Sequence, residues 1–261
     1  MDDEVTIIGV NMKRDIVVVT AAYGWDNVKK LGGQANLLPI IAESGANGVE
    51  IRRELLSDAE LKTLGQLARQ IADHQLFAVY SVPEGLFALD GSLNPQLENR
   101  LREAAELNAR TVKFSLGHYQ PGYDITELNA LLSKYPVQLV VENDQTPDCG
   151  IFSPLNAFFA AVQDCHSPIR MTFDMANWDW VGEDAHIAAQ KLAHMVHYVH
   201  VKAAEKRPQG WCAVELDNSD GRWKPLLAEL PHQAMRGIEF PLEGDDLTSV
   251  TRHYVNLLRA D

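Results

Sequence analysis

The chain has 261 residues, of which 46% are hydrophobic, and carries a formal net charge of −13 at pH 7. This length suits one large α/β core, whereas the acidic excess argues against a nucleic-acid partner, since phosphate binding needs Lys and Arg. No apolar stretch approaches the roughly 20 residues of a membrane span, and the odd number of cysteines, 3, lacks metal-type spacing, so we expect a reduced, cytoplasmic protein without membrane association.

Strand-like and helix-like segments alternate from about residue 16 to residue 259. Strands are predicted near 16–22, 47–52, 76–81, 110–115, 137–142, 169–174, 197–202 and 234–240. Helices are predicted between them at 34–44, 58–74, 95–108, 124–134, 154–165, 184–195, 222–230 and 245–259. The polar segment 203–221 is predicted as the longest loop, either a lid or an excursion over the site.

Eight strand–helix units in one chain of this size predict a single-domain (β/α)8 TIM barrel over residues 16–261, with residues 1–15 as an N-terminal extension. A doubly wound open sheet is the alternative fold. It is disfavoured because no Gly-rich dinucleotide or phosphate loop follows the first strand.

The alternation of strand side chains predicts which groups enter the barrel. In 169–174, Ile169, Met171 and Phe173 form an apolar outer face, so Asp174 points inward. Barrel active sites form at the carboxyl ends of the strands, where the βα loops converge. By the same test, this mouth collects Glu50, Arg52, Lys113, Glu142, Asp174, His200, Lys202 and Glu239.

Four of these groups predict a metal site. A single Glu at a strand end is more often solvated or salt-bridged, but Glu142, Asp174, His200 and Glu239 share one face and one end. Burying such groups is costly without a common partner. Three carboxylates and one imidazole suit a divalent ion, Mn²⁺ before Mg²⁺, Co²⁺ or Zn²⁺.

The remaining polar groups predict a substrate pocket. Arg52, Lys113 and Lys202 either offset the carboxylates or bind a carboxylate or phosphate of the substrate. Glu50 and Asn177 are predicted at the substrate as well, where Asn177 would bond sugar hydroxyls. Trp178 and Trp180 either wall a sugar pocket or pack locally.

The chain resembles the sugar phosphate isomerase/epimerase superfamily, the xylose-isomerase-like barrels that also include ketose 3-epimerases and endonuclease IV. The likeness is strongest to epimerases of 2-ketogluconate utilisation. The superfamily resemblance rests on VEIRRELL (49–56), VKFSLG (112–117), VVENDQTP (140–147), MTFDMANWDW (171–180), YVHVKA (198–203) and GIEFPLEGDDL (237–247), and the likeness to these epimerases rests on ENDQTP and the TFD-x-x-NW pattern. The resemblance implies that Glu142, Asp174, His200 and Glu239 bind the metal. Relatives are often dimers or tetramers, which is compatible with a homo-oligomer here, but the sequence leaves the oligomeric state open.

These observations predict an isomerase that moves a proton next to a carbonyl through an enediolate. Glu142 and Glu239 would act as base and acid on opposite faces of a keto-sugar acid, such as a 2-ketogluconate, or of a sugar phosphate. Epimerisation and aldose–ketose isomerisation both stay open. The alternatives are a non-catalytic sugar-binding barrel and an endonuclease-IV-like phosphodiesterase, which would need many histidines and a zinc cluster.

Overall fold

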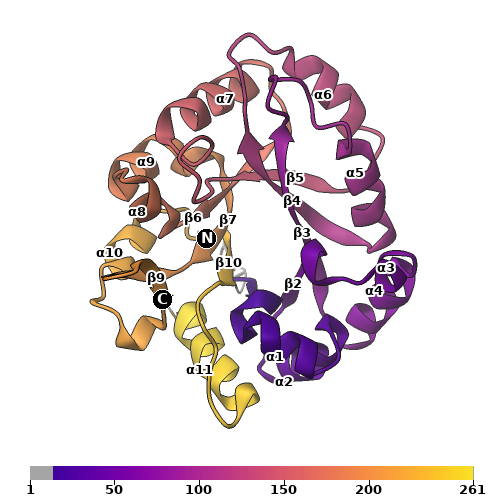
Figure 1. Ribbon diagram of the computed structural model, residues 1–261, viewed down its shortest axis with the longest axis vertical. Coiled ribbons are helices and arrows are strands. Elements are labelled where there is room, and N and C mark those ends of the chain that lie inside the picture. The colour runs from indigo at the N-terminus through magenta and orange to yellow at the C-terminus, as the bar shows by residue number, and fades with distance from the viewer. Residues whose placement is uncertain (1–13, 261) are drawn as a thin grey trace, which may run out of the picture.

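The computed structural model describes residues 14–260, so most of the predicted extension 1–15 lies outside the described residues. Within this range a closed barrel has the strand order β1-β10-β7-β6-β5-β4-β3-β2, and every neighbouring pair is parallel (Figure 1). Its strands are β1 (Ile16–Val19), β2 (Gly48–Arg52), β3 (Phe77–Phe87), β4 (Ala109–Gly117), β5 (Gln138–Glu142), β6 (Arg170–Asp174), β7 (Val196–Val201) and β10 (Met235–Ile238). The predicted (β/α)8 barrel is confirmed, and the closed sheet excludes the open doubly wound alternative.

Helices surround the barrel, as Figure 1 shows. The α-helices are α1 (Trp25–Lys30), α2 (Leu38–Glu43), α3 (Asp58–Leu61), α4 (Leu64–Asp73), α5 (Leu97–Glu106), α6 (Ile125–Leu132), α7 (Phe152–Asp164), α8 (Asn177–Val181), α9 (Ala185–Leu192), α10 (Trp223–Ala228) and α11 (Leu247–Ala260). Short 3-10 turns are η1 (Thr20–Tyr23), η2 (Gln34–Leu37), η3 (Arg53–Leu55), η4 (Ala193–Met195) and η5 (Leu216–Asn218). No helix within residues 14–260 is long and apolar enough to cross a membrane.

The predicted helix 58–74 is divided into α3 and α4. A reciprocal capping box fixes the start of α3, because the Ser57 hydroxyl accepts the Glu60 N–H while the Glu60 carboxylate accepts the Ser57 N–H. Thr63 then leaves helical geometry with a φ of −131° and precedes α4. The helical periodicity of the segment is therefore real, but its backbone is interrupted.

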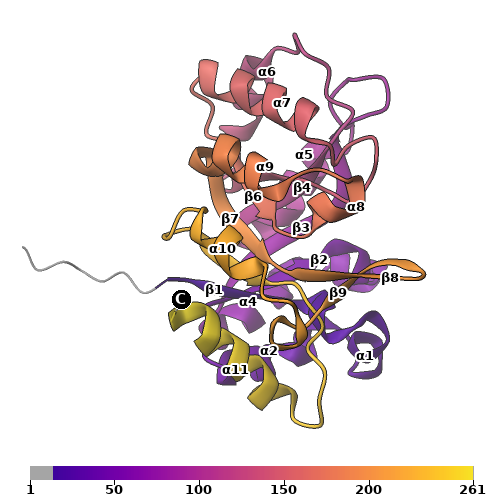
Figure 2. The same cartoon turned by 90° about the vertical axis from the view of Figure 1, so that its left-hand side faces the viewer.

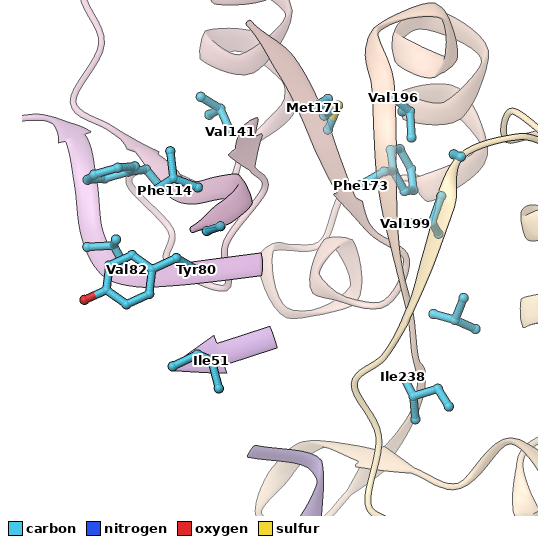
Figure 3. Packing of buried hydrophobic residues seen from close by; sticks show 14 of the residues in the cluster. Ile51, Tyr80, Val82, Phe114, Val141, Met171, Phe173, Val196, Val199 and Ile238 are labelled. Carbon is cyan, nitrogen blue, oxygen red and sulfur yellow. The ribbon is translucent and has the colours of Figure 1, made fainter. Parts of the chain in front are cut away.

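The strands carry two separate apolar layers. Outward side chains such as Phe114, Met171 and Val199 pack between the strands and the helices (Figure 3), as the alternation predicted. A smaller cluster fills the barrel interior, and its members are Val17, Phe77, Val79, Tyr198 and Met235. Gly237 makes room for it, since a Cβ there would overlap the Tyr198 ring. This interior cluster therefore lies below the charged side chains at the carboxyl ends of the strands.

The predicted loop 203–221 contains an antiparallel hairpin of β8 (Ala203–Arg207) and β9 (Gly210–Val214). Figure 2 shows it projecting at the same end of the barrel as α1 and α8. The helices α1 and α8 were not predicted either, and each lies in a βα connection at this end. The mouth of the barrel is thus more ordered than the polar sequence of its loops indicates.

Candidate metal centre

Four strand ends bring a ligand set together. Glu142 and Asp174 end β5 and β6, His200 lies near the end of β7, and Glu239 directly follows β10. Each of the four offers one ligand atom, and these atoms all lie within 4.8 Å of one another. The structure therefore collects the predicted quartet in one place, with a separation that one cation could span.

In both glutamates one oxygen faces the centre while a cation binds the other. Glu142 Oε2 accepts a hydrogen bond from Lys113 Nζ at 2.6 Å, which leaves Oε1 on the inner side. Glu239 Oε1 accepts from Arg52 at 3.1 Å, and its Oε2 points inward. These outer contacts fix the orientation of each carboxylate, which is how a metal site is held in shape before the ion binds.

Asp174 is oriented by the backbone. Its Oδ1 accepts the N–H groups of Ala176 and Asn177, both at 2.9 Å. Asn143 ties this corner to β5, because its amide both donates to the Asp174 carbonyl and accepts from the Asp174 N–H, each at 2.9 Å. The second oxygen, Oδ2, is left on the inner side.

His200 presents a lone pair to the same centre. Its Nε2 lies 2.8 Å from Glu50 Oε2, an oxygen that also accepts the Tyr198 hydroxyl at 2.9 Å. Because a carboxylate only accepts, Nε2 carries the proton in the neutral ring. Nδ1 then faces Glu142 Oε1 at 2.7 Å and Glu239 Oε2 at 3.1 Å, and neither Nδ1 nor Glu142 Oε1 has a hydrogen-bond partner among the described residues. Acceptors that face one another require a cation or a proton between them.

The titration of the buried groups reflects the same crowding. Burial raises the pKa of Asp174, and the charges of Glu239 and Glu142 add to this against Lys202, so the pKa reaches about 7. Burial lowers the pKa of His200, but Glu239, Glu50 and Glu142 outweigh it and hold that pKa well above its ordinary value. Both shifts indicate an excess of negative charge that a cation would relieve.

The charge of the cluster matches a divalent ion. When His200 is neutral, as an imidazole must be to bind a metal, the five carboxylates and three cations of the cluster leave two negative charges. The carboxylates are Glu50, Glu54, Glu142, Asp174 and Glu239, and the cations are Arg52, Lys113 and Lys202. Since burying an uncompensated charge is expensive, these residues fit an M²⁺ ion.

Several residues predicted at the substrate contact the quartet or its neighbours. Glu50 has 0% exposure and lies behind His200. Lys113, 2% exposed, bonds Glu142. Asn177 is occupied by the protein, because its amide donates to the Asn143 carbonyl at 2.8 Å and accepts from Lys202 at 3.2 Å. These side chains are thus buried and point toward the quartet, away from solvent.

The two predicted pocket tryptophans have different surroundings. Trp178 is 1% exposed and packs on Phe173 with ring centroids 5.5 Å apart, so the local-packing alternative is the correct one for it. Trp180 lies at the mouth, where its ring is 5.7 Å from Lys202 Nζ and 6.3 Å from the Trp211 ring of the hairpin.

A cavity of about 340 Å³ opens beside the ligands. Glu239, Arg52 and Lys202 line it, together with Trp25 of α1 and Ala213 of β9. Trp25 is 48% exposed and was missed by sequence reasoning. The signal available was its position shortly after the first strand, at the end of the barrel where active sites form.

A second cavity of about 380 Å³ lies between α8, α9, the hairpin and α10, and it shares Lys202 with the first. The residues that line it include none of the four ligands among the described residues. Of these two cavities, the smaller one is therefore the one that reaches the quartet, through Glu239.

Comparison with known proteins places the fold. No protein-family model and no curated protein matches the chain. Solved structures match over nearly its whole length. The IolI protein, solved with a bound zinc atom, has a TM-score of 0.72 at 13% identity and covers 94% of this chain and 98% of its own.

Two further solved structures show the same likeness. A xylose isomerase domain containing protein from Salmonella typhimurium has a TM-score of 0.70 at 14% identity, covering 97% and 98% of the two chains. An L-ribulose 3-epimerase has a TM-score of 0.64 at 17% identity, covering 95% of each chain. The resemblance read from the sequence is thus confirmed for the fold, which is that of the xylose-isomerase-like barrels.

Proposed function

We propose that the protein is a metal-dependent sugar isomerase or epimerase in which Glu142, Asp174, His200 and Glu239 hold a divalent ion, Mn²⁺ first. The observation that carries this proposal is the geometry of the quartet, since each member turns one ligand atom inward while a protein group binds its other end. When bound, the ion would act as a Lewis acid on a substrate carbonyl and make the neighbouring proton more acidic.

Two members of the quartet are suited to proton transfer. The side chains of Glu142 and Glu239 keep 13% and 15% of their surface exposed, whereas those of His200 and Asp174 have none. In the barrel, β6 and β7 separate the two glutamates on one side and β1, β2, β3 and β4 on the other. They therefore approach a bound sugar from different directions, as an acid and base pair must to invert a carbon centre.

The surroundings keep both glutamates ionised, which is the form that a general base requires. Burial raises the pKa of Glu142, but Lys113 and His200 outweigh it and bring the pKa below its ordinary value. Burial acts in the same way on Glu239, where His200 and Lys202 hold the pKa well below that value. Removal and return by one glutamate on one face would give aldose–ketose isomerisation, and the use of both glutamates would give epimerisation.

The cavity supports a keto-sugar acid, such as a 2-ketogluconate, or a sugar phosphate as substrate. Its wall carries the cations of Arg52 and Lys202, which can bind a carboxylate or phosphate, and the indole of Trp25, which can cover the apolar face of a sugar. The cavity volume of about 340 Å³ is in the range of pockets for small metabolites.

The test is isotope exchange. The Mn²⁺-loaded protein is incubated in deuterated water with 2-ketogluconate, neutral ketoses and ketose phosphates, and NMR follows loss of the proton next to the carbonyl. We expect exchange with at least one of them, and a drop of about 10²-fold or more in Glu142→Gln and Glu239→Gln. A protein with bound Mn²⁺ that exchanges none of these sugars, or full exchange in both variants, would contradict the proposal.

A further inference from the structure

Lys202 lies within the ligand set and binds the oxygens that would bind the metal. Its Nζ donates to Asp174 Oδ2 and Glu239 Oε2, both at 3.2 Å, and to Asn177 Oδ1 at 3.2 Å. The two carboxylate oxygens are the inward ones, since Asp174 Oδ1 is held by backbone N–H groups and Glu239 Oε1 by Arg52. The ammonium group therefore occupies one side of the cation site.

The other two cations of the cluster behave differently. Lys113 donates to Glu142 Oε2 and Arg52 donates to Glu239 Oε1, and both oxygens are turned away from the centre. A metal ion could thus bind without disturbing Lys113 or Arg52. It could not bind Asp174 and Glu239 without repelling the Lys202 ammonium, because two cations would then share the same oxygens at close range in a site with little water.

Lys202 has a place to move to. It is 8% exposed, it lines both cavities at the mouth, and the ring of Trp180 lies 5.7 Å from its Nζ. Rotation about its flexible four-carbon chain would carry the ammonium off the carboxylates and into the open cavity. The face of Trp180 would remain within reach of the charge there.

We propose that Lys202 is an internal counter-ion that competes with the metal. It compensates Asp174 and Glu239 in the metal-free protein, and metal binding displaces its ammonium into the substrate cavity. The inference rests on the proposed function for the presence of a metal site, and it explains why the residue predicted to bind a substrate anion bonds the ligands here. Metal loading and the supply of a free cation for an anionic substrate would then be one event.

The first test measures Mn²⁺ affinity by isothermal titration calorimetry. We expect Lys202→Met to bind Mn²⁺ at least about tenfold more tightly than the unchanged protein, because the competing charge is gone. Lys113→Met is the matched control, since it removes the same charge from an outward oxygen and should gain clearly less affinity than Lys202→Met. Equal gains in both variants, or no gain in Lys202→Met, would overturn the inference.

Thermal unfolding gives an independent measure. Metal-free Lys202→Met should melt at a lower temperature than the unchanged protein, and saturating Mn²⁺ should raise its Tm by more, since ligand linkage follows affinity. Lys202→Gln, which keeps a donor for Asn177, replaces the Met variant if the latter does not fold without metal. A crystal structure of the Mn²⁺-loaded protein with Nζ still bonded to Asp174 and Glu239 would also refute the displacement.

These measurements separate the two proposals. If neither the unchanged protein nor any variant binds Mn²⁺, the metal site and this inference both fail. If the unchanged protein binds Mn²⁺ and the Lys202 variants bind it no more tightly, the metal site stands and only the counter-ion role is lost.

Discussion

Glu50 offers the sharpest test of how the site is held. It lies on β2, 150 residues before His200, and its Oε2 accepts both His200 Nε2 and the Tyr198 hydroxyl. In Glu50→Gln the amide oxygen is the one acceptor left for these two donors. The amide NH₂ group would take the place of Glu50 Oε1, which lies 3.5 Å from Lys113 Nζ, and would bring a second donor next to this ammonium group. The change also removes one of the two excess negative charges that an M²⁺ ion would balance.

Replacement of such a supporting carboxylate costs about 10- to 100-fold in metal affinity, or about 1.4–2.8 kcal/mol. We expect this loss in a calorimetric titration with Mn²⁺, and a lower Tm for metal-free Glu50→Gln. Tyr198→Phe is the control, because it keeps the carboxylate and removes only the second donor, and it should retain most of the affinity. An unchanged Mn²⁺ dissociation constant in Glu50→Gln would refute the claim that Glu50 orients His200.

Three further predictions concern stability. Chelation of the metal should lower Tm, since an ion at 100 times its Kd adds about 2.7 kcal/mol of stability, and melts with and without EDTA check this. Gly117 has a φ of 69° and a Cβ there would collide with the Phe87 carbonyl, whereas Gly122 has a φ of 97° in open space. Gly117→Ala should therefore lower the free energy of unfolding, measured in urea, by more than about 2 kcal/mol, and Gly122→Ala should lower it by about 1 kcal/mol. Equal losses in the two variants would contradict this. Burial raises the pKa of Glu103, but its contacts with Arg53, Tyr80 and Arg100 together outweigh this and lower it, so the stability that Glu103 contributes is present above pH about 4.5 and lost as pH falls through the folded value. In Glu103→Gln the free energy of unfolding should therefore fall less steeply as the pH is lowered into the acid range. The same pH dependence as in the unchanged protein would contradict this role of Glu103.

The pattern of the strands was sufficient for the architecture. Period-two alternation in 169–174 separated Met171 and Phe173, which pack outward, from Asp174, which ends the strand inward. The same rule predicted that the His200 side chain points into the barrel. These predictions succeed because the direction of a side chain on a strand depends only on the local backbone, and a repeated βα unit leaves few ways to close a sheet.

Local irregularities at the mouth were not predictable in the same way. The strands β8 and β9 and the helices α1 and α8 are five or six residues long, so hydrophobic periodicity gives little signal for them. Trp178 and Trp180 lie two residues apart and have unlike surroundings, one packed on Phe173 and one facing Lys202. That difference depends on how α8 lies against the barrel.

The amino-acid sequence alone thus determined the closed barrel and the residue types gathered at its carboxyl end. Only the tertiary structure decided the pairing among them: Glu50 behind His200, Lys113 on the outer oxygen of Glu142, and Lys202 between Asp174 and Glu239. The physical reason is that each pairing joins different strands across the barrel interior. Which oxygen meets which cation depends on strand register and on Å-scale distances that no local pattern in the chain encodes.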